Sequence, residues 1–128
     1  MSQARRLRGA AARRSGRRAE ILAALWLMAK GYRILGFRLN TPQGEIDLLV
    51  SRGRVLAAVE VKTRATIEAA LEAVGPDQRQ RLRRALAAIA ARRGRLQDAE
   101  VRLDLMALAP GRLPRHIPGA WSEDGGRP

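Results

Sequence analysis

The chain has 128 residues, of which 46% are hydrophobic, so it can bury one core but not two independent ones. Its 25 basic and 12 acidic residues give a net charge of +13, which favours a polyanionic partner; the alternative is a solvated surface on an arginine-rich chain. The absence of cysteine excludes a disulfide framework and thiolate–zinc chemistry.

The N-terminal part divides into a basic arm and a helix. Residues 1–14 contain five arginines and four alanines, which predicts a disordered arm. Ser15 is a good N-cap, and the helix that it begins should end before Gly31. Because this helix is apolar on nearly every side, we expect it to be largely buried.

A signal peptide is the competing interpretation of this region, because arginines precede the apolar run Ile21–Ala29. The run is short, however, and no small-x-small cleavage site follows it. It is also far below the roughly 20 residues of a membrane span. We therefore expect a cytoplasmic protein with no membrane partner.

Three strands should follow the helix. The segments 32–39, 45–51 and 54–63 are separated by Thr41-Pro42-Gln43-Gly44 and by a two-residue turn at 52–53. Strands joined by such tight turns form an antiparallel meander.

The second half predicts helices and one more strand. Residues 66–74 could form a short helix or a mobile loop, whereas Pro76 begins a long helix that Gly94 ends. Residues 101–108 alternate as a strand would. The resulting fold class is α/β, with a sheet backed by helices over a domain of residues 15–109. Residues 110–128 should be a loose tail, docked near Ile117 and Trp121.

The third strand carries charges where a core is expected. Alternate residues of a strand share a face, so Glu60 and Lys62 point one way while Val59 and Val61 point the other. A surface salt bridge on a solvated face would explain this pair. We favour a functional site instead, because the strand should be central and buried charges are costly unless paired or bound to metal.

Two further observations support a site. Asp47 on the neighbouring strand could meet Glu60, and Mg²⁺ sites often use one or two carboxylates. Only Lys30 and Lys62 among the 25 basic residues are lysine. Lysine is a compact charge whose pKa can shift, as a group beside a scissile phosphate requires.

These residues carry a family resemblance. Gly44-Glu45-Ile46-Asp47 followed by Val59-Glu60-Val61-Lys62-Thr63-Arg64 resembles the YraN family, also called UPF0102, which is similar to archaeal Holliday-junction resolvases and to the PD-(D/E)XK nuclease-like superfamily. Gly16 and Glu20 resemble that family's Gly-x-x-x-Glu motif. Segments 102–104 and 116–117 also match, so the resemblance covers about residues 15–121.

The resemblance implies a restriction-endonuclease-like αβββαβ core with a mixed sheet flanked by helices. It implies catalytic roles for Asp47, Glu60, Lys62 and Glu20, with Asp47 and Glu60 holding Mg²⁺ or Mn²⁺. Glu20 could instead be a helix N-terminal carboxylate that the dipole favours. Gln78 stands where the family usually has a lysine. Glutamine carries no positive charge, so it cannot make the phosphate contact that a lysine at this position could make.

Arginine clusters supply the expected nucleic-acid contacts. Phosphate contacts of this kind give affinity without sequence specificity. The residues that we expect to bind nucleic acid are Arg64, Arg79, Arg81, Arg83 and Arg84. We interpret His116 as structural or exposed, not catalytic.

The function that follows is a metal-dependent endonuclease acting on DNA, branched DNA included, and the resolvase likeness implies a homodimer. The first alternative is a non-catalytic DNA-binding or scaffold protein that keeps the nuclease fold. A basic ribosome- or RNA-associated protein is the second. An intact Asp47, Glu60 and Lys62 set favours catalysis, because a pure binder does not need acids facing phosphate.

Overall fold

The computed structural model describes the backbone of residues 3–122 and the side chains of residues 16–122. Its elements confirm an α/β fold whose order matches the expected αβββαβ core, with one short helix added before the second long one. In chain order they are α1 Gln3–Ala29, β1 Arg33–Thr41, β2 Gly44–Arg52, β3 Val55–Thr63, α2 Ile67–Glu72, α3 Pro76–Arg92, the 3-10 helix η1 Gly94–Leu96, β4 Glu100–Leu108 and β5 Arg115–Ile117.

The sheet has the order β1-β2-β3-β4-β5, so β3 lies at its centre as predicted. Strands β1, β2 and β3 form the expected antiparallel meander. Strand β4 pairs parallel to β3 along the register from Val55↔Glu100 to Thr63↔Leu108. A parallel neighbour requires a crossover connection, which α2 and α3 provide.

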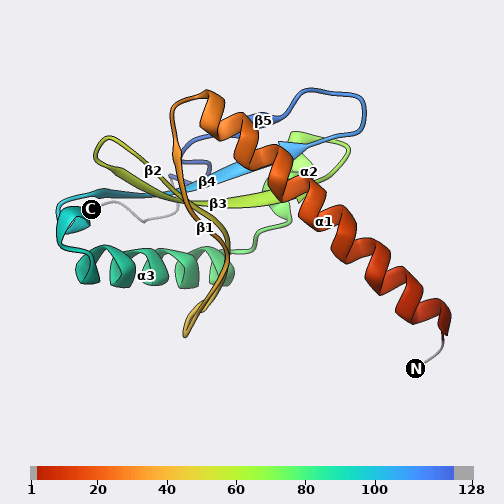
Figure 1. The fold of residues 1–128 in the computed structure, drawn as a ribbon, viewed down its shortest axis with the longest axis horizontal. Helices are drawn as coiled ribbons and strands as arrows, with labels where there is room; N and C mark the ends of the chain where they lie inside the picture. The colour runs from red at the N-terminus through yellow and green to blue at the C-terminus, as the bar shows by residue number, and fades with distance from the viewer. Residues whose placement is uncertain (1–2, 123–128) are drawn as a thin grey trace.

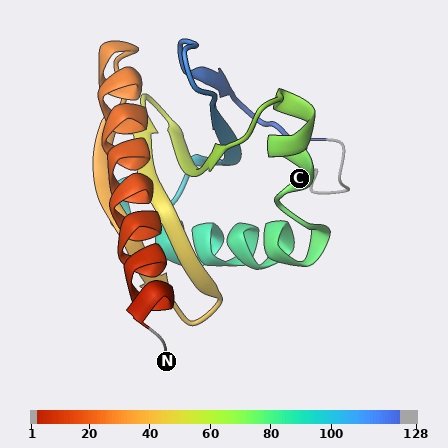
Figure 2. The same cartoon turned by 90° about the vertical axis from the view of Figure 1, so that its right-hand side faces the viewer.

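The molecule has three layers, with α1 on one face of the sheet and α3 on the other (Figures 1 and 2). On the α1 side, Leu27 packs with Leu48 and Val59 of the sheet. On the α3 side, Leu86 packs with Leu56 in a separate cluster. Alternation along β2 and β3 thus supplies a hydrophobic layer on each face of the one sheet, and both layers belong to the same domain.

Helix α1 differs from its prediction in burial. The apolar residues of α1 that are buried against the sheet are Ala23, Ala24 and Leu27, with Ala19 and Trp26 partly buried beside them. The helix has one sheet face to cover, and no other element of residues 3–122 packs over its back, so the prediction that it is largely buried is wrong. Its exposed apolar residues are Ile21, Leu22, Leu25 and Met28, which are 47–57% exposed.

The helix also starts earlier than predicted. It begins at Gln3 instead of Ser15, so residues 3–14, predicted to be a disordered arm, have a helical backbone. Alanine and arginine favour helix strongly, which accounts for the extension. Residues 1 and 2 and all side chains up to residue 15 lie outside the described part. No helix among the described residues is long and apolar enough to cross a membrane.

The tail is held to the domain at both expected anchors. Strand β5 pairs with β4 through Leu105↔Ile117, and Trp121 is only 9% exposed. The ring nitrogen of Trp121 donates a hydrogen bond to the Leu71 carbonyl at 3.3 Å. Residues 123–128 lie outside the described part.

Candidate active site

A pocket of about 390 Å³ lies between α1 and the adjoining ends of β2 and β3. Its lining brings together three of the predicted catalytic residues, Glu20, Asp47 and Lys62. Arg64, a predicted nucleic-acid contact, lies at the same pocket and is exposed. Segments far apart in the sequence therefore meet at this one concave surface.

Asp47 is fixed by the way in which the β2–β3 ladder ends. The last paired residues are Leu48 and Val59, so the next part of β3 has no backbone partner on β2. The carboxylate of Asp47 replaces that partner, and its Oδ2 accepts a hydrogen bond from the Val61 backbone N–H at 3.0 Å. This bond ties the Asp47 side chain to the strand that carries Glu60.

Glu60 is the buried acid of the site, with 2% of its surface exposed. Burial and, after it, the negative charge of Asp47 together raise its pKa to about 8, although the charge of Lys62 acts in the opposite direction. Its Oε1 is buried and has no hydrogen-bond partner among the described residues. A buried acceptor without a partner is costly, so a ligand that satisfies this oxygen would bind favourably.

Glu20 already has a partner on the neighbouring strand. Its Oε1 accepts a hydrogen bond from Arg38 Nε at 2.7 Å, and Glu20 is only 9% exposed. The interpretation of Glu20 as a helix N-terminal carboxylate is wrong, because α1 begins at Gln3 and Glu20 lies deep within it. Its contact with Arg38 makes it a residue that shapes the pocket wall.

Arg38 is a member of the site that sequence reasoning missed. The Glu20 hydrogen bond raises the pKa of its guanidinium, and the charges of Glu45 and Asp47 add to this. Its φ of 48° is in the left-handed region, which non-glycine residues rarely adopt and which concentrates at functional sites.

The Gly-x-x-x-Glu motif gains a physical reason from Arg38. A Cβ on Gly16 would come within 3.2 Å of the Arg38 guanidinium. Gly16 and Glu20 share a face of the helix because they are four residues apart. The motif therefore leaves room for Arg38 at one position and binds it at the other.

The acids of this site would offer a divalent cation two carboxylates, Asp47 in the pocket lining and Glu60, which is buried beside Asp47. No cluster of three or more His, Cys, Asp or Glu residues able to hold a metal ion exists within the described residues. Asp47 and Glu60 supply two hard oxygen donors, and the unsatisfied Oε1 of Glu60 is suited to a ligand. Mg²⁺ commonly binds through one or two carboxylates, with water completing the shell.

The predicted nucleic-acid contacts divide into two groups. Arg79 donates to the Val74 carbonyl at 2.6 Å, and Arg83 donates to the Trp121 carbonyl at 2.9 Å. Both side chains thus have partners that hold the α2–α3 connection and the tail. Arg81 and Arg84 are exposed on α3.

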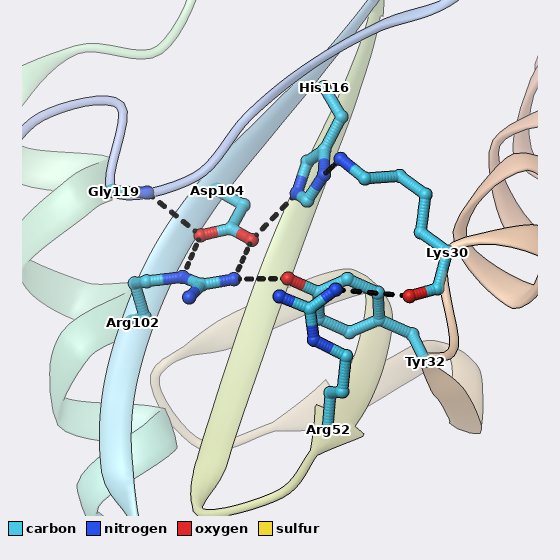
Figure 3. A network of polar contacts seen from close by, with 7 residues as sticks. All are labelled: Lys30, Tyr32, Arg52, Arg102, Asp104, His116 and Gly119. Atoms are coloured by element: carbon cyan, nitrogen blue, oxygen red, sulfur yellow. Dashed lines mark hydrogen bonds and ion pairs between the residues drawn. The ribbon is translucent and has the colours of Figure 1, made fainter.

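A second polar cluster, which sequence reasoning did not assign, centres on Asp104 of β4 (Figure 3). Its carboxylate accepts two hydrogen bonds from Arg102, at 2.7 and 2.9 Å, and one from the Gly119 N–H at 2.9 Å. His116 Nε2 contacts the same carboxylate at 2.9 Å. The matches noted at 102–104 and 116–117 were the only sequence signal for it. We call this cluster the Asp104 clamp.

The protonation of the clamp follows from its donors. Lys30 can only donate, and its Nζ lies 2.6 Å from His116 Nδ1, so that nitrogen accepts and Nε2 donates to Asp104. Burial alone would raise the pKa of Asp104, but hydrogen bonds from His116, Arg102 and Gly119 hold it below its ordinary value. With its side chain 1% exposed, His116 is structural.

The fold and site together define an α/β protein of restriction-endonuclease-like topology, in which the buried Glu60 and the half-buried Asp47 lie together at the end of two central strands. Residues 19–108 match the model of the uncharacterised protein family UPF0102, and the chain belongs to that family. The match includes every residue of the candidate pocket except Gly16.

Relatives support this assignment over nearly the whole chain. A UPF0102 protein of Caulobacter vibrioides is 70% identical over 117 residues, covering 91% of this chain and 94% of the relative. One from another Caulobacter species is 73% identical, covering 92% and 85%. A third, from Paramagnetospirillum magneticum, is 52% identical over 118 residues, covering 89% and 92%.

Proposed function

We propose that this protein is a metal-dependent endonuclease that hydrolyses phosphodiester bonds in DNA. The observation that carries the proposal is the acid pair: Glu60 is buried beside Asp47 with an unsatisfied oxygen, at a pocket that Lys62 lines. A buried acid with a pKa raised to about 8 is typical of functional sites. The resemblance of the motifs at residues 44–47 and 59–64 to the PD-(D/E)XK superfamily supports the same function.

The pocket residues have separate tasks in this proposal. Asp47 and Glu60 would hold Mg²⁺ or Mn²⁺, which when bound would supply Lewis-acid activation of water and of the phosphate. Lys62 would donate to the phosphate or to the attacking water and stabilise charge that develops there. Arg64, exposed at the pocket mouth, would bind a neighbouring phosphate.

Arg38 and Glu20 would act as positioning residues. Their ion pair connects α1 to β1 along the pocket wall, and Arg38 also lies in the field of Asp47. Because this ion pair fixes the wall of the pocket that Asp47 also lines, it would keep the proposed metal-binding carboxylate in place. We therefore expect their loss to weaken metal binding more than DNA binding.

The test is cleavage of branched and plasmid DNA with Mg²⁺ or Mn²⁺, comparing wild type with Asp47→Ala and Glu60→Gln. Product that requires the metal and disappears in both variants supports hydrolysis at this pocket. Glu100→Gln, which changes an exposed acid at the far end of the sheet, is the matched control. Cleavage that survives both pocket changes would come from another site or a contaminant.

The second candidate function is non-catalytic DNA binding, which the net charge of +13 favours on its own. It predicts the same DNA affinity with and without the metal and no product with any substrate. The preference for branched DNA and the homodimer stay predictions of the resemblance. Sedimentation analysis and binding to four-way junctions would test them separately.

A further inference from the structure

A second pocket, of about 600 Å³, lies at the opposite end of the sheet from the acid pair. It is formed by the start of β1, the β2–β3 turn and the segment that follows α3, which lie together at the left of Figure 1. Arg52 at this end follows Asp47 by five positions on β2, which at about 3.3 Å per residue places them roughly 17 Å apart. We call it the arginine pocket.

The lining of the arginine pocket is strongly one-sided in charge. Four arginines contribute to it, Arg33, Arg52, Arg93 and Arg95, and no aspartate or glutamate does. No salt bridge joins any of the four to an acid within the described residues, in contrast to Arg38 and Arg102. Like charges gathered in one concave surface repel, and an anion in the pocket would remove that repulsion.

One of these arginines is held in place by the rest of the fold. Arg52 donates from Nη1 to the Lys30 carbonyl at 3.0 Å, and its guanidinium lies 4.4 Å from the centre of the Tyr32 ring (Figure 3). The hydroxyl of Tyr32 in turn accepts from Arg102 of the Asp104 clamp at 2.7 Å. Arginine has five N–H donors, so this support fixes the group and leaves most donors for a ligand.

The rest of the lining suits a ligand larger than a bare ion. Leu35 and Leu96 add apolar surface to the pocket, and Gly31 and Gly53 leave its rim without bulky side chains. A volume of about 600 Å³ is within the range of sites for small organic ligands. Guanidinium groups bind phosphate oxygens in pairs, with better geometry than ammonium groups.

We infer that the arginine pocket binds the phosphate groups of a nucleotide, either free or as part of a nucleic-acid strand. A solvated arginine surface is the plain alternative, and the helix dipole favours basic residues at the end of α3 in any case. That alternative explains Arg93 but not Arg33 and Arg52, which come from the sheet and close the other side of the pocket. The inference does not depend on hydrolysis at the acid pair.

The experiment measures metal-free binding, with EDTA present, of ATP and of a short DNA duplex by calorimetry. The variants are Arg33→Gln and Arg95→Gln, one from each side of the pocket. Arg54→Gln is the matched control, because Arg54 is exposed on the same turn, outside the pocket, and carries the same charge. We expect each pocket variant to weaken binding about tenfold, as charged hydrogen bonds allow, and the control by less than twofold.

The two probes distinguish the sources of phosphate. Weaker ATP binding in the pocket variants identifies a free nucleotide, whereas an effect on the duplex alone identifies strand phosphates. Equal, small losses in all three variants with both probes would overturn the inference and leave an ordinary basic surface. Because no metal is present and no cleavage is measured, a failure of the proposed nuclease activity would leave this result unchanged.

Discussion

We expect the free energy of unfolding of the wild-type protein to fall as the pH rises. Replacing Glu60 by glutamine should remove most of this pH dependence. The folded protein raises the pKa of Glu60 from 4.5 to about 8, chiefly through burial. Between these values the folded state keeps a proton that the unfolded state has released, so the free energy of unfolding falls with rising pH. Glutamine has nearly the same shape and no charge to bury.

The size of the effect follows from the two pKa values. Their difference corresponds to at most about 5 kcal/mol at high pH, of which roughly 3 to 4 kcal/mol would be lost between pH 5 and pH 8. Asp104 does not interfere, because its lowered pKa confines its contribution to the acid side: that stability is present above about pH 4 and is lost below it. The decline of the free energy of unfolding between pH 5 and pH 8 therefore reports on the titration of Glu60.

The assay is urea unfolding of wild type, Glu60→Gln and the exposed control Glu100→Gln at several pH values from 5 to 8. We expect a steep decline in the wild type and the control, and a much flatter curve for Glu60→Gln. Saturating Mg²⁺ or Mn²⁺ at pH 8 should stabilise the wild type and the Glu100→Gln control, but not Glu60→Gln, by about 2.7 kcal/mol at one hundred times the dissociation constant. Parallel curves for all three proteins would refute the reasoning.

Four further predictions address the rest of the molecule. Lys62→Arg should keep DNA affinity but lower cleavage about 10²-fold or more, because the larger guanidinium cannot readily lose its proton; near-normal plasmid nicking would show that position 62 supplies only diffuse charge. Asp104→Asn should cost about 3–5 kcal/mol in urea unfolding, because Arg102 would lose its buried partner; a loss below 1 kcal/mol would mean that the clamp is dispensable. Arg38→Gly should be more stable than Arg38→Ala by about 1 kcal/mol in urea unfolding. Both variants lose the ion pair with Glu20, but of the two residues only glycine tolerates a φ of 48°. The reverse order of stability would show that the backbone is not strained at this position. DNA binding should weaken with salt, with a log–log slope of about −0.9 per neutralised phosphate, whereas a flat titration would remove the electrostatic argument.

The elements and the acid pair could be predicted because their signals are local. Alternation along residues 55–63 separates Glu60 from Val59, and the structure packs Val59 into the core beneath α1. Tight turns place β2 beside β3, so Asp47 was expected near Glu60. Such patterns depend only on the geometry of a strand and of a short turn.

The remaining features depend on partners that are distant in the sequence. Glu20 and Arg38 are 18 positions apart, and Arg38 has an unusual backbone conformation. Neither feature can be read from the local sequence pattern. The hydrogen bond from Arg102 to Tyr32 spans 70 positions. Exposure of α1 was missed because the apolar content of a helix does not say how many neighbours will cover it.

The Asp104 clamp joins residues that are far apart in the sequence, and this affects which parts of the chain can fold first during synthesis. The bond between Asp47 and Val61 closes a loop of only 14 positions, and the meander around it can form as soon as β3 has left the ribosome. Lys30, by contrast, meets His116 across 86 positions, and Gly119 reaches Asp104 from almost the last described turn. The acid pair therefore has its backbone frame early, while the contact of the Lys30 side chain with His116 forms only when the C-terminal residues emerge.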